Sequence, residues 1–338
     1  MRRLGFLTFS ISIICVFFGE AQALKADPAA GKPSVIKRIP LPGPVGEWDY
    51  ASVDTERNRL YVGREAGAMS VDLDTGSATL MAESSGTAIV FRLPASDLLL
   101  STNPDDKTAA LWDLNSNKVV ALLPTGKAPD AATYEPVSGL VVVANHAGGD
   151  LTLIDPQLRR AVGTISAVGP KLEFVVADGT GRVYVNAEAT AEIVVVDIMH
   201  RKILDRYPLR KCKEPTGLGL DVLTHRLIAA CGNGVAKILD VRSGQDLGTL
   251  PIGEGADAVL IDAQRRRAYI PNGDSGTLTV IDLAAPGTAV IGNVATQQGA
   301  RTGALDPRTG WVYLPTAVES PDRKSYVAGS FEILVVGE

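Results

Sequence analysis

The chain repeats one pattern of short strand-forming segments from end to end, and an aspartate closes each copy. The clearest copy, residues 256–283, is an apolar run, a polar turn and two further β-branched runs (ADAVLIDAQRRRAYIPNGDSGTLTVIDL). The closing aspartates recur at intervals of 41 to 43 residues, at Asp72, Asp113, Asp155, Asp197, Asp240 and Asp282. A unit of three or four strands that repeats at ~40–45 residues is typical of a β-propeller blade.

Seven such repeats fit the chain, with starting points near Trp48, Thr87, Asp130, Glu173, Thr216, Asp257 and Arg301. The last repeat stops at residues 331–336 without a fourth strand, and the strand-like segment 35–41 has nothing before it to pair with. We therefore predict an all-β, seven-bladed β-propeller of four-stranded blades, formed as one domain by residues 35–338. The N-terminal strand completes the last blade, which closes the ring and removes exposed sheet edges.

The last repeat also departs from the pattern. Val335 stands where the other repeats have the closing aspartate, and residues 318–330 are an insertion. Extra length in one connection of a regular ring is expected to be functional or disordered.

The N-terminus has the features of a secretory signal peptide. Residues 1–23 combine Arg2 and Arg3 with the apolar run 4–18 and a small-residue site that predicts cleavage after Ala23. The apolar run is shorter than the ~20 residues of a membrane span, and Cys15 lies inside it, which argues against a lipoprotein anchor. We predict a flexible tail over residues 24–34, no membrane span, and a periplasmic or secreted protein in an oxidising compartment.

The formal net charge of −5 is mildly acidic. Proteins that bind a nucleic-acid backbone usually carry a basic patch, so nucleic acid is an unlikely partner on this criterion. The expected partner is a small molecule or a periplasmic protein, and the expected state is a monomer.

Several repeats carry a recognisable pair of motifs. Val183-Tyr184-Val185-Asn186, Tyr269-Ile270-Pro271-Asn272 and residues 141–145 (VVVAN) are each followed by a strand that ends in Val-Asp or Ile-Asp. In these motifs the chain resembles the YVTN β-propeller repeat family, the YncE-like secreted propellers, over nearly the whole mature length. The resemblance implies the propeller fold. It implies no activity, because related seven-bladed folds include lactonases, quinoprotein-like dehydrogenases and the haem-d1 domain of nitrite reductases.

Alignment of the repeats places a ring of polar side chains at the start of the first strands. Its members are Asp49, Thr87, Asp130, Glu173, Thr216, Asp257 and Arg301. First strands line the channel of a propeller, so these side chains are expected at its mouth, flanked by Trp48. Two carboxylates ~7 Å apart repel by roughly 2 kcal/mol at an effective dielectric of ~20, so the ring needs a counter-charge. The alternative is that each acid only caps backbone N–H groups.

A second ring is expected from the ends of the middle strands, and it includes Asn145, Asn186 and Asn272. Asparagine supplies a donor and an acceptor toward the mouth, although it also tolerates left-handed turns. His146, in the next loop, is the one histidine expected on this face; a solvated loop histidine is the alternative.

These rings leave three functions open. The first is a secreted binding module that holds a small ligand, a cation or a protein partner at the channel mouth. The second is a metal-dependent, lactonase-type hydrolase, in which Asp49, Asp130, Glu173 and Asp257 would hold a divalent cation such as Ca²⁺. The third is an accessory subunit of a redox enzyme. The chain has no Cys-x-x-Cys-His, no Gly-x-Ser-x-Gly and no phosphate loop that would name a cofactor or nucleophile.

Two cysteines remain once Cys15 leaves with the signal peptide. Cys212 precedes the first strand of the fifth repeat, and Cys231 ends its second strand. An even pair in an exported protein usually forms a disulfide, which would hold Glu214 at the rim of the mouth. Two buried free thiols are the alternative.

Overall fold

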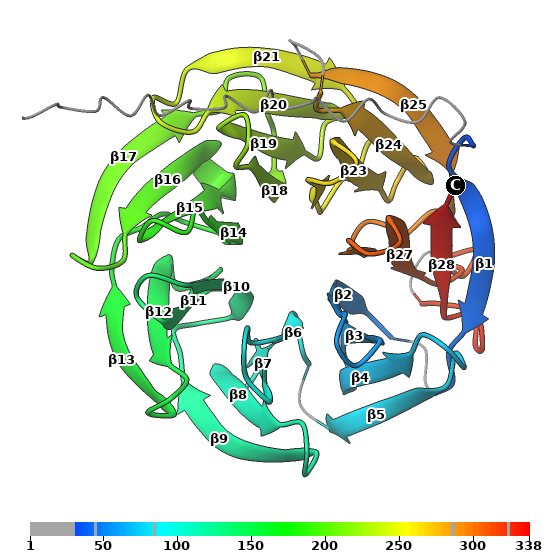
Figure 1. Ribbon diagram of the computed structural model, residues 1–338, viewed down its shortest axis with the longest axis horizontal. Helices are drawn as coiled ribbons and strands as arrows, with labels where there is room; N and C mark the ends of the chain where they lie inside the picture. The colour runs from blue at the N-terminus through cyan, green and yellow to red at the C-terminus, as the bar shows by residue number, and fades with distance from the viewer. Residues whose placement is uncertain (1–30, 44–45, 84–85, 285–287, 323–324) are drawn as a thin grey trace, which may run out of the picture. The chain divides into compact units, whose positions relative to one another are not determined.

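The computed structural model describes residues 31–43, 46–83, 86–284, 288–322 and 325–338. Contacts group residues 31–338 into one unit, and its strands form seven antiparallel four-stranded sheets arranged as blades around a central channel (Figure 1). The predicted seven-bladed propeller of four-stranded blades is confirmed. The predicted signal peptide and residues 24–30 of the predicted tail lie outside the described residues.

Each blade runs from an inner strand at the channel to an outer strand at the surface. Blade 1 contains β2 (Trp48–Asp54), β3 (Arg59–Arg64), β4 (Gly67–Asp72) and β5 (Ala78–Glu83). Blade 2 contains β6 (Val90–Arg92), β7 (Leu98–Asn103), β8 (Thr108–Asp113) and β9 (Lys118–Pro124). Blade 3 contains β10 (Pro129–Glu135), β11 (Leu140–Asn145), β12 (Asp150–Asp155) and β13 (Arg160–Ile165). Blade 4 contains β14 (Leu172–Ala177), β15 (Arg182–Ala187), β16 (Glu192–Asp197) and β17 (Lys202–Pro208).

The remaining blades follow the same order. Blade 5 contains β18 (Pro215–Asp221), β19 (Arg226–Cys231), β20 (Val235–Asp240) and β21 (Asp246–Pro251). Blade 6 contains β22 (Leu260–Asp262), β23 (Arg267–Asn272), β24 (Thr277–Asp282) and β25 (Ala289–Ala295). Blade 7 contains β26 (Ala304–Asp306), β27 (Trp311–Thr316), β28 (Glu332–Gly337) and, as its outer strand, β1 (Ser34–Pro40). A single 3₁₀ turn, η1 (Glu188–Thr190), is the helical element in the described residues.

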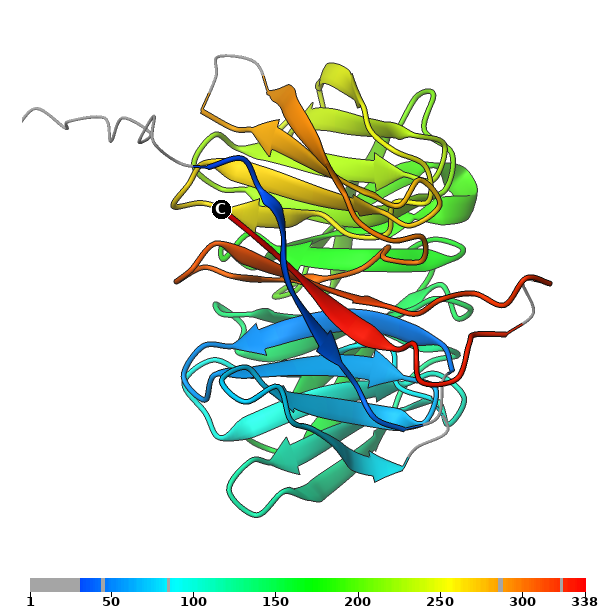
Figure 2. The ribbon, with the colours of Figure 1, turned by 90° about the vertical axis from the view of Figure 1, so that its right-hand side faces the viewer.

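The ring closes between the two ends of the described chain. β1 pairs antiparallel with β28, with Ile39 opposite Ile333 and Val35 opposite Val336 (Figure 2). This pairing gives β28 a partner on its outer side, as the sequence predicts.

The closing aspartates of the repeats have a structural role in the turns between the third and fourth strands. The carboxylate of Asp72 accepts from the backbone N–H groups of Asp74 and Thr75, and Asp240 does the same for Arg242 and Ser243. Each aspartate therefore fixes the geometry of its own turn.

The core lies between neighbouring blades. The middle strands are buried on both faces, and one apolar cluster runs from Leu111 in blade 2 through Val143 in blade 3 to Val185 in blade 4. Burial of each valine or leucine of this kind contributes ~1.5–3 kcal/mol. The outer strands β17 and β25 are mostly exposed or half-buried, and each has a single buried residue, because one face of the strand meets solvent.

Polar contacts also join adjacent blades. The guanidinium of Arg266 in blade 6 donates to both carboxylate oxygens of Asp221 in blade 5, at 2.8 and 2.6 Å. Near the channel mouth, the hydroxyl of Thr302 in blade 7 donates to the carbonyl oxygen of Asp49 in blade 1 at 2.7 Å. The first strands are thereby fixed relative to one another, which sets the positions of the side chains at the mouth.

Candidate functional site: an acidic mouth above an aromatic floor

Four carboxyl groups meet where the first strands begin. Asp49, Asp130, Glu173 and Asp257 come from blades 1, 3, 4 and 6, and each one interacts electrostatically with at least one other member. We call these four residues the acidic ring. The repeats place them at equivalent positions, so the regular fold itself brings the four charges together.

Burial raises the pKa of all four carboxyls, and repulsion between members of the ring adds to the shift in three of them. Burial is the largest cause of the raised pKa of Asp130, and the charges of Asp49, Glu173 and Asp257 add to it. The pKa of Asp49 also lies well above its usual value, mainly through burial and then through Asp257. Burial raises the pKa of Glu173 to about 7 and raises that of Asp257 as well. Raised pKa values mean that the ionised forms are disfavoured, so the ring favours bound protons or a bound positive charge.

Arg301 supplies one counter-charge. Its Nε lies 3.4 Å from Asp257, and its Nη2 donates to the carbonyl oxygen of Trp48 at 2.7 Å. A weaker contact joins the guanidinium to Glu47 at 3.7 Å. One arginine beside four ring carboxyls leaves the mouth acidic.

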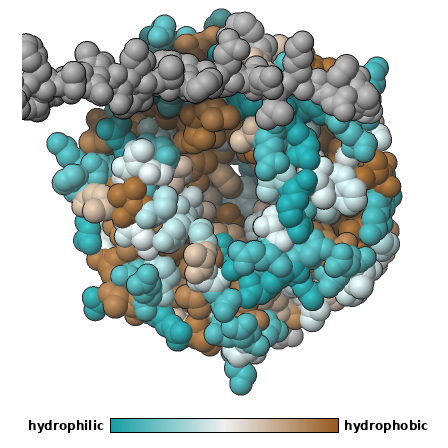
Figure 3. All heavy atoms as spheres, viewed as in Figure 1, coloured by the Kyte–Doolittle hydropathy of each residue, from teal (hydrophilic) through white to brown (hydrophobic). Residues whose placement is uncertain are grey.

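Two aromatic rings form the floor below the acidic ring. The strands β2 and β14, which carry Tyr50 and Phe174, lie on opposite sides of the channel (Figure 1). The two rings meet edge to face with their centroids 5.1 Å apart. Burial raises the pKa of the Tyr50 hydroxyl well above its usual value, and all four ring carboxyls add to this. Below the floor, Ser52, Val53, Leu260 and Leu305 help line a small, largely apolar chamber of about 180 Å³. On the face that carries the C-terminus, the centre of the propeller is hollowed and hydrophobic side chains border part of the hollow (Figure 3).

The insertion in the last repeat covers one side of the mouth. Its Tyr326 packs on Trp48, with ring centroids 4.9 Å apart, and its hydroxyl donates to Glu47 at 3.0 Å. Phe331 packs on the same indole at 5.5 Å. The segment projects from the face opposite the C-terminus (Figure 2). Trp48 is only 1% exposed, so in this structure it supports the mouth and offers no surface to a ligand.

The asparagines predicted to face the mouth are instead buried within the blades. Asn145, Asn186 and Asn272 have no exposed surface. The side-chain amide of Asn145 donates to Asp150 and Thr152 of its own hairpin, and that of Asn186 donates to the carbonyl oxygens of Thr216 and Gly217 in blade 5. The amide of Asn272 donates to Thr277 and Thr279 in the same way. These contacts hold hairpins and blades together and leave no asparagine atom at the surface of the mouth.

His146 lies at the edge of the acidic ring. Its Nδ1 is 2.8 Å from a carboxylate oxygen of Glu173, and this hydrogen bond is the main cause of its raised pKa. Glu188, at the start of η1, completes a group of three whose ligand atoms all lie within 4.8 Å of one another. Among the described residues no other His, Cys, Asp or Glu group meets that criterion. The four predicted metal ligands are therefore not gathered around one ion, and Glu173 alone belongs to both sets.

The cysteines occupy the rim of the same face. Cys212 and Cys231 form a disulfide with Cα atoms 5.5 Å apart, which confirms the predicted bond. The backbone carbonyl of Glu214 accepts from Gly232 N–H at 3.0 Å, and the Glu214 side chain is exposed on the rim. The disulfide thus fixes the loop that carries Glu214, although that residue makes no contact with the acidic ring in this structure.

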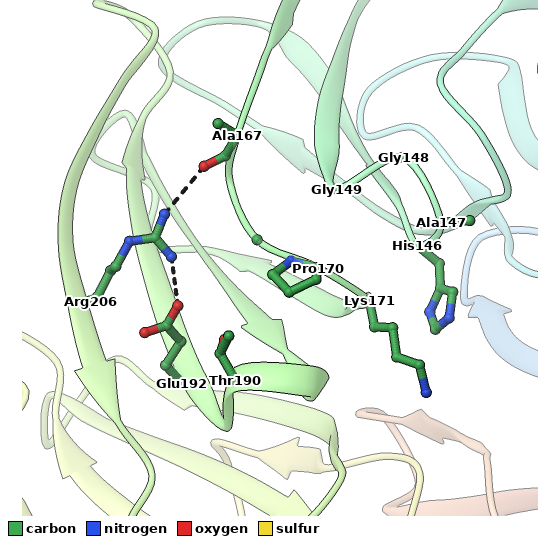
Figure 4. Close-up of a pocket in the computed structure, with 11 residues that line it drawn as sticks. His146, Ala147, Gly148, Gly149, Ala167, Pro170, Lys171, Thr190, Glu192 and Arg206 are labelled. Atoms are coloured by element: carbon green, nitrogen blue, oxygen red, sulfur yellow. Dashed lines mark hydrogen bonds and ion pairs between the residues drawn. The ribbon is translucent and has the colours of Figure 1, made fainter.

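A pocket of about 650 Å³ opens beside the mouth, between blades 3 and 4 (Figure 4). His146 and Lys171 lie on one wall, and Arg206, Glu192 and Thr190 lie on the other. The guanidinium of Arg206 donates to the carboxylate of Glu192 at 2.6 Å and to the carbonyl oxygen of Ala167 at 3.2 Å. His146 lines this pocket and also contacts Glu173 of the acidic ring.

Sequence reasoning missed Glu188, Lys171 and the contact between Tyr326 and Trp48. A usable signal existed for Glu188, because His146 and Glu188 both follow the asparagine near the end of a second strand, in neighbouring repeats. No repeat alignment covers Tyr326, because it lies in the insertion.

Comparisons with known proteins identify the fold. No protein-family model and no curated protein sequence matches the chain, so the likeness to the YVTN family stays a resemblance. Among solved structures, the chain is similar to RRP9 WD40 repeats, with a TM-score of 0.77 and 9% identity over 91% of this chain and 99% of the other. A chain of a Mitotic Checkpoint Complex matches with a TM-score of 0.74 and 11% identity over 98% of this chain and 99% of that one.

A chain of Kuenenia stuttgartiensis Hydrazine Synthase matches with a TM-score of 0.73 and 12% identity over 88% of this chain and 97% of that one. At such identities the likeness is one of architecture, not of chemistry. No helix among the described residues is long and apolar enough to cross a membrane. The comparisons thus place the chain among β-propellers with WD40-like neighbours.

Proposed function

We propose that this chain is an exported binding module that holds a small organic cation at the acidic mouth of its channel. The observation that carries the proposal is the placement of Asp49, Asp130, Glu173 and Asp257 above the aromatic floor of Tyr50 and Phe174. The disulfide between Cys212 and Cys231 supports export, because such bonds persist in oxidising compartments.

The arrangement of the carboxyls favours an organic cation over a single metal ion. Three ligand atoms must converge closely to hold one ion, and no three members of the acidic ring do so among the described residues. An ammonium group with an alkyl chain contacts carboxylates on different blades at once. Aromatic rings below it add a cation–π attraction of ~0.5–2 kcal/mol.

A bound cation also relieves the repulsion among the ring carboxyls. The raised pKa of Asp130 means that its ionised form is disfavoured when no further positive charge is near. A positive charge beside the ring favours ionisation, so binding of a cation releases protons near neutral pH. The calorimetric heat of binding should therefore depend on the ionisation enthalpy of the buffer.

The test is isothermal titration of the mature protein with 1,4-diaminobutane, with 1,4-butanediol as the uncharged analogue. We expect the diamine to bind, the diol not to bind, and added salt to weaken binding. Asp130→Asn should weaken binding about tenfold, since one close charge contact is removed. Asp106→Asn is the matched control, because Asp106 is an exposed acid in a turn of the mouth face and is not among the main causes of the raised pKa values of the ring.

Equal binding of the diamine and the diol would overturn the proposal. So would equal weakening by Asp130→Asn and Asp106→Asn, because charge in general, and not the acidic ring, would then govern binding.

A further inference from the structure

Beside the acidic ring, the structure gathers a second group of polar side chains with different chemistry. His146 follows β11, Glu173 lies on β14, and Glu188 begins η1. Their ligand atoms all lie within 4.8 Å of one another, and His146 Nδ1 is 2.8 Å from Glu173 Oε1. Two neighbouring blades thus converge on one point at the mouth.

The donor set is typical of a borderline divalent ion. One imidazole nitrogen and two carboxylates suit Zn²⁺, Co²⁺ or Mn²⁺, whereas Ca²⁺ prefers oxygen ligands alone. Glu173 is 8% exposed, so one ligand is held in place by the surrounding protein. The side chains of His146 and Glu188 are 32% and 14% exposed, which leaves the site open on one side.

Through His146, the site adjoins the pocket between blades 3 and 4. His146 and Lys171 form part of the pocket wall (Figure 4). Three protein ligands beside a solvent-accessible pocket are the arrangement in which a metal keeps a coordination position for water or an added ligand. The pocket volume of about 650 Å³ is within the usual range for small-molecule sites.

In this structure Lys171 forms an ion pair with Glu188. Its Nζ lies 3.1 Å from the Glu188 carboxylate, and its side chain is 55% exposed. An exposed lysine is released at small cost, because surface ion pairs contribute ~0–1 kcal/mol. Lys171 therefore competes weakly with an incoming ion, and once released it remains on the pocket wall.

We propose that His146, Glu173 and Glu188 form a binding site for a divalent transition-metal ion such as Zn²⁺, with an open coordination position toward the pocket. This goes beyond the proposed function and shares only Glu173 with it. Lys171 and Arg206 on the pocket walls would favour an anionic group, such as a carboxylate, as the added ligand on the metal.

The test is calorimetric titration of chelator-treated mature protein with Zn²⁺, together with Co²⁺ titration followed by visible absorption. We expect one Zn²⁺ per chain and Co²⁺ bands whose intensity reports the coordination geometry. His146→Ala and Glu188→Gln should each weaken Zn²⁺ binding about tenfold or more and change the Co²⁺ spectrum. Lys171→Gln should leave the affinity unchanged or raise it a few fold, because a competing cation is removed.

The matched control is His200→Ala. His200 Nδ1 lies 2.9 Å from Asp197, much as His146 lies beside Glu173, but no third ligand completes that pair in the described part of the chain. We expect no change in Zn²⁺ affinity for this variant. Equal losses of Zn²⁺ affinity in His146→Ala and His200→Ala would overturn the proposed metal site. So would the absence of Zn²⁺ binding by the wild-type protein.

The same variants separate this site from the acidic ring. If His146→Ala keeps Zn²⁺ binding while Asp130→Asn loses it, the ion lies in the acidic ring and the proposed metal site is wrong. If His146→Ala loses Zn²⁺ binding but the diamine still does not bind the wild-type protein, the metal site stands and the proposed function falls.

Discussion

Tyr50 and Phe174 meet edge to face across the channel, with their ring centroids 5.1 Å apart, although they belong to blades 1 and 4. At the same position of the other repeats stand Ala88, Ala131, Gly217, Ala258 and Thr302. Two large side chains among five small ones thus lie between the acidic mouth and the apolar chamber.

The first prediction concerns this floor. Phe174→Ala should lower the free energy of unfolding by about 2 kcal/mol, since it removes the ring pair and part of the buried area. It should also weaken binding of 1,4-diaminobutane. Urea denaturation and calorimetry measure the two effects. Tyr50→Phe is the control, because it keeps the ring contact and should change stability by less than about 1 kcal/mol; equal losses in both variants would contradict the prediction.

The second prediction is that the protein without a bound cation loses stability as the pH rises from about 4.5 to 7. Carboxyls whose pKa is raised by folding bind more protons in the folded state, so their contribution to stability is lost as the pH rises through the folded pKa. For Glu173, with a pKa of about 7, the loss is on the order of 3 kcal/mol. The pKa of Asp130 is also raised, so its contribution to stability is likewise lost as the pH rises.

The aspartates in the turns have the opposite effect on the pH dependence of stability, and their effect falls in a lower pH range. Hydrogen bonds lower the pKa of Asp72, chiefly from Thr75, so its contribution is lost only as the pH falls below the usual aspartate value. Thermal unfolding followed from strongly acidic to weakly basic pH should therefore show a maximum at weakly acidic pH. Asp130→Asn should reduce the loss of stability at pH values above that maximum. An unchanged pH profile in this variant would refute the attribution of that loss to the acidic ring.

The third prediction concerns the disulfide between Cys212 and Cys231. Both residues are buried, at 6% and 0% exposure. They are 19 positions apart in sequence, so the double substitution Cys212→Ala and Cys231→Ala should lower the free energy of unfolding by ~3 kcal/mol. Thiol counting of the mature chain under denaturing, non-reducing conditions should find none. Two free thiols per chain would exclude the bond.

The fourth prediction concerns the strand that closes the ring. Deletion of residues 31–41 removes β1 and leaves the outer side of β28 unpaired, so unfolding should lose its cooperativity. A chain that begins at Gly31 keeps β1 and is the control. Circular dichroism during heating measures both, and an identical transition in the two proteins would refute the closure model.

The repeat pattern was sufficient to predict the fold because one turn chemistry recurs in most blades. Asp72 and Asp240 accept the same two backbone hydrogen bonds, so the aspartate marks the end of the third strand wherever the chain turns. Val335 breaks the pattern for a physical reason. It lies opposite Lys37 of β1, and no turn follows it, because the fourth strand comes from the other end of the chain.

The candidate site was only partly predictable. The acidic residues of the ring follow from the alignment of the repeats, because equivalent positions lie at equivalent heights in the channel. The direction of an asparagine side chain does not follow from alignment: Asn145 bonds within its own hairpin, whereas Asn186 bonds to the next blade. Contacts that involve the insertion, such as Tyr326 with Trp48, depend on a loop path that no repeat encodes.

The pairing of β1 with β28 has a consequence for how the protein folds. Most strand pairs are hairpins between neighbours in sequence, so six blades assemble from local contacts. Val35 and Val336, by contrast, are about 300 residues apart, and joining them has the largest loop-closure entropy of any strand pair in the ring. The pair of β1 and β28 can form only after the whole chain is available, so we expect the last blade to close slowly and to be the blade most exposed to aggregation before it closes.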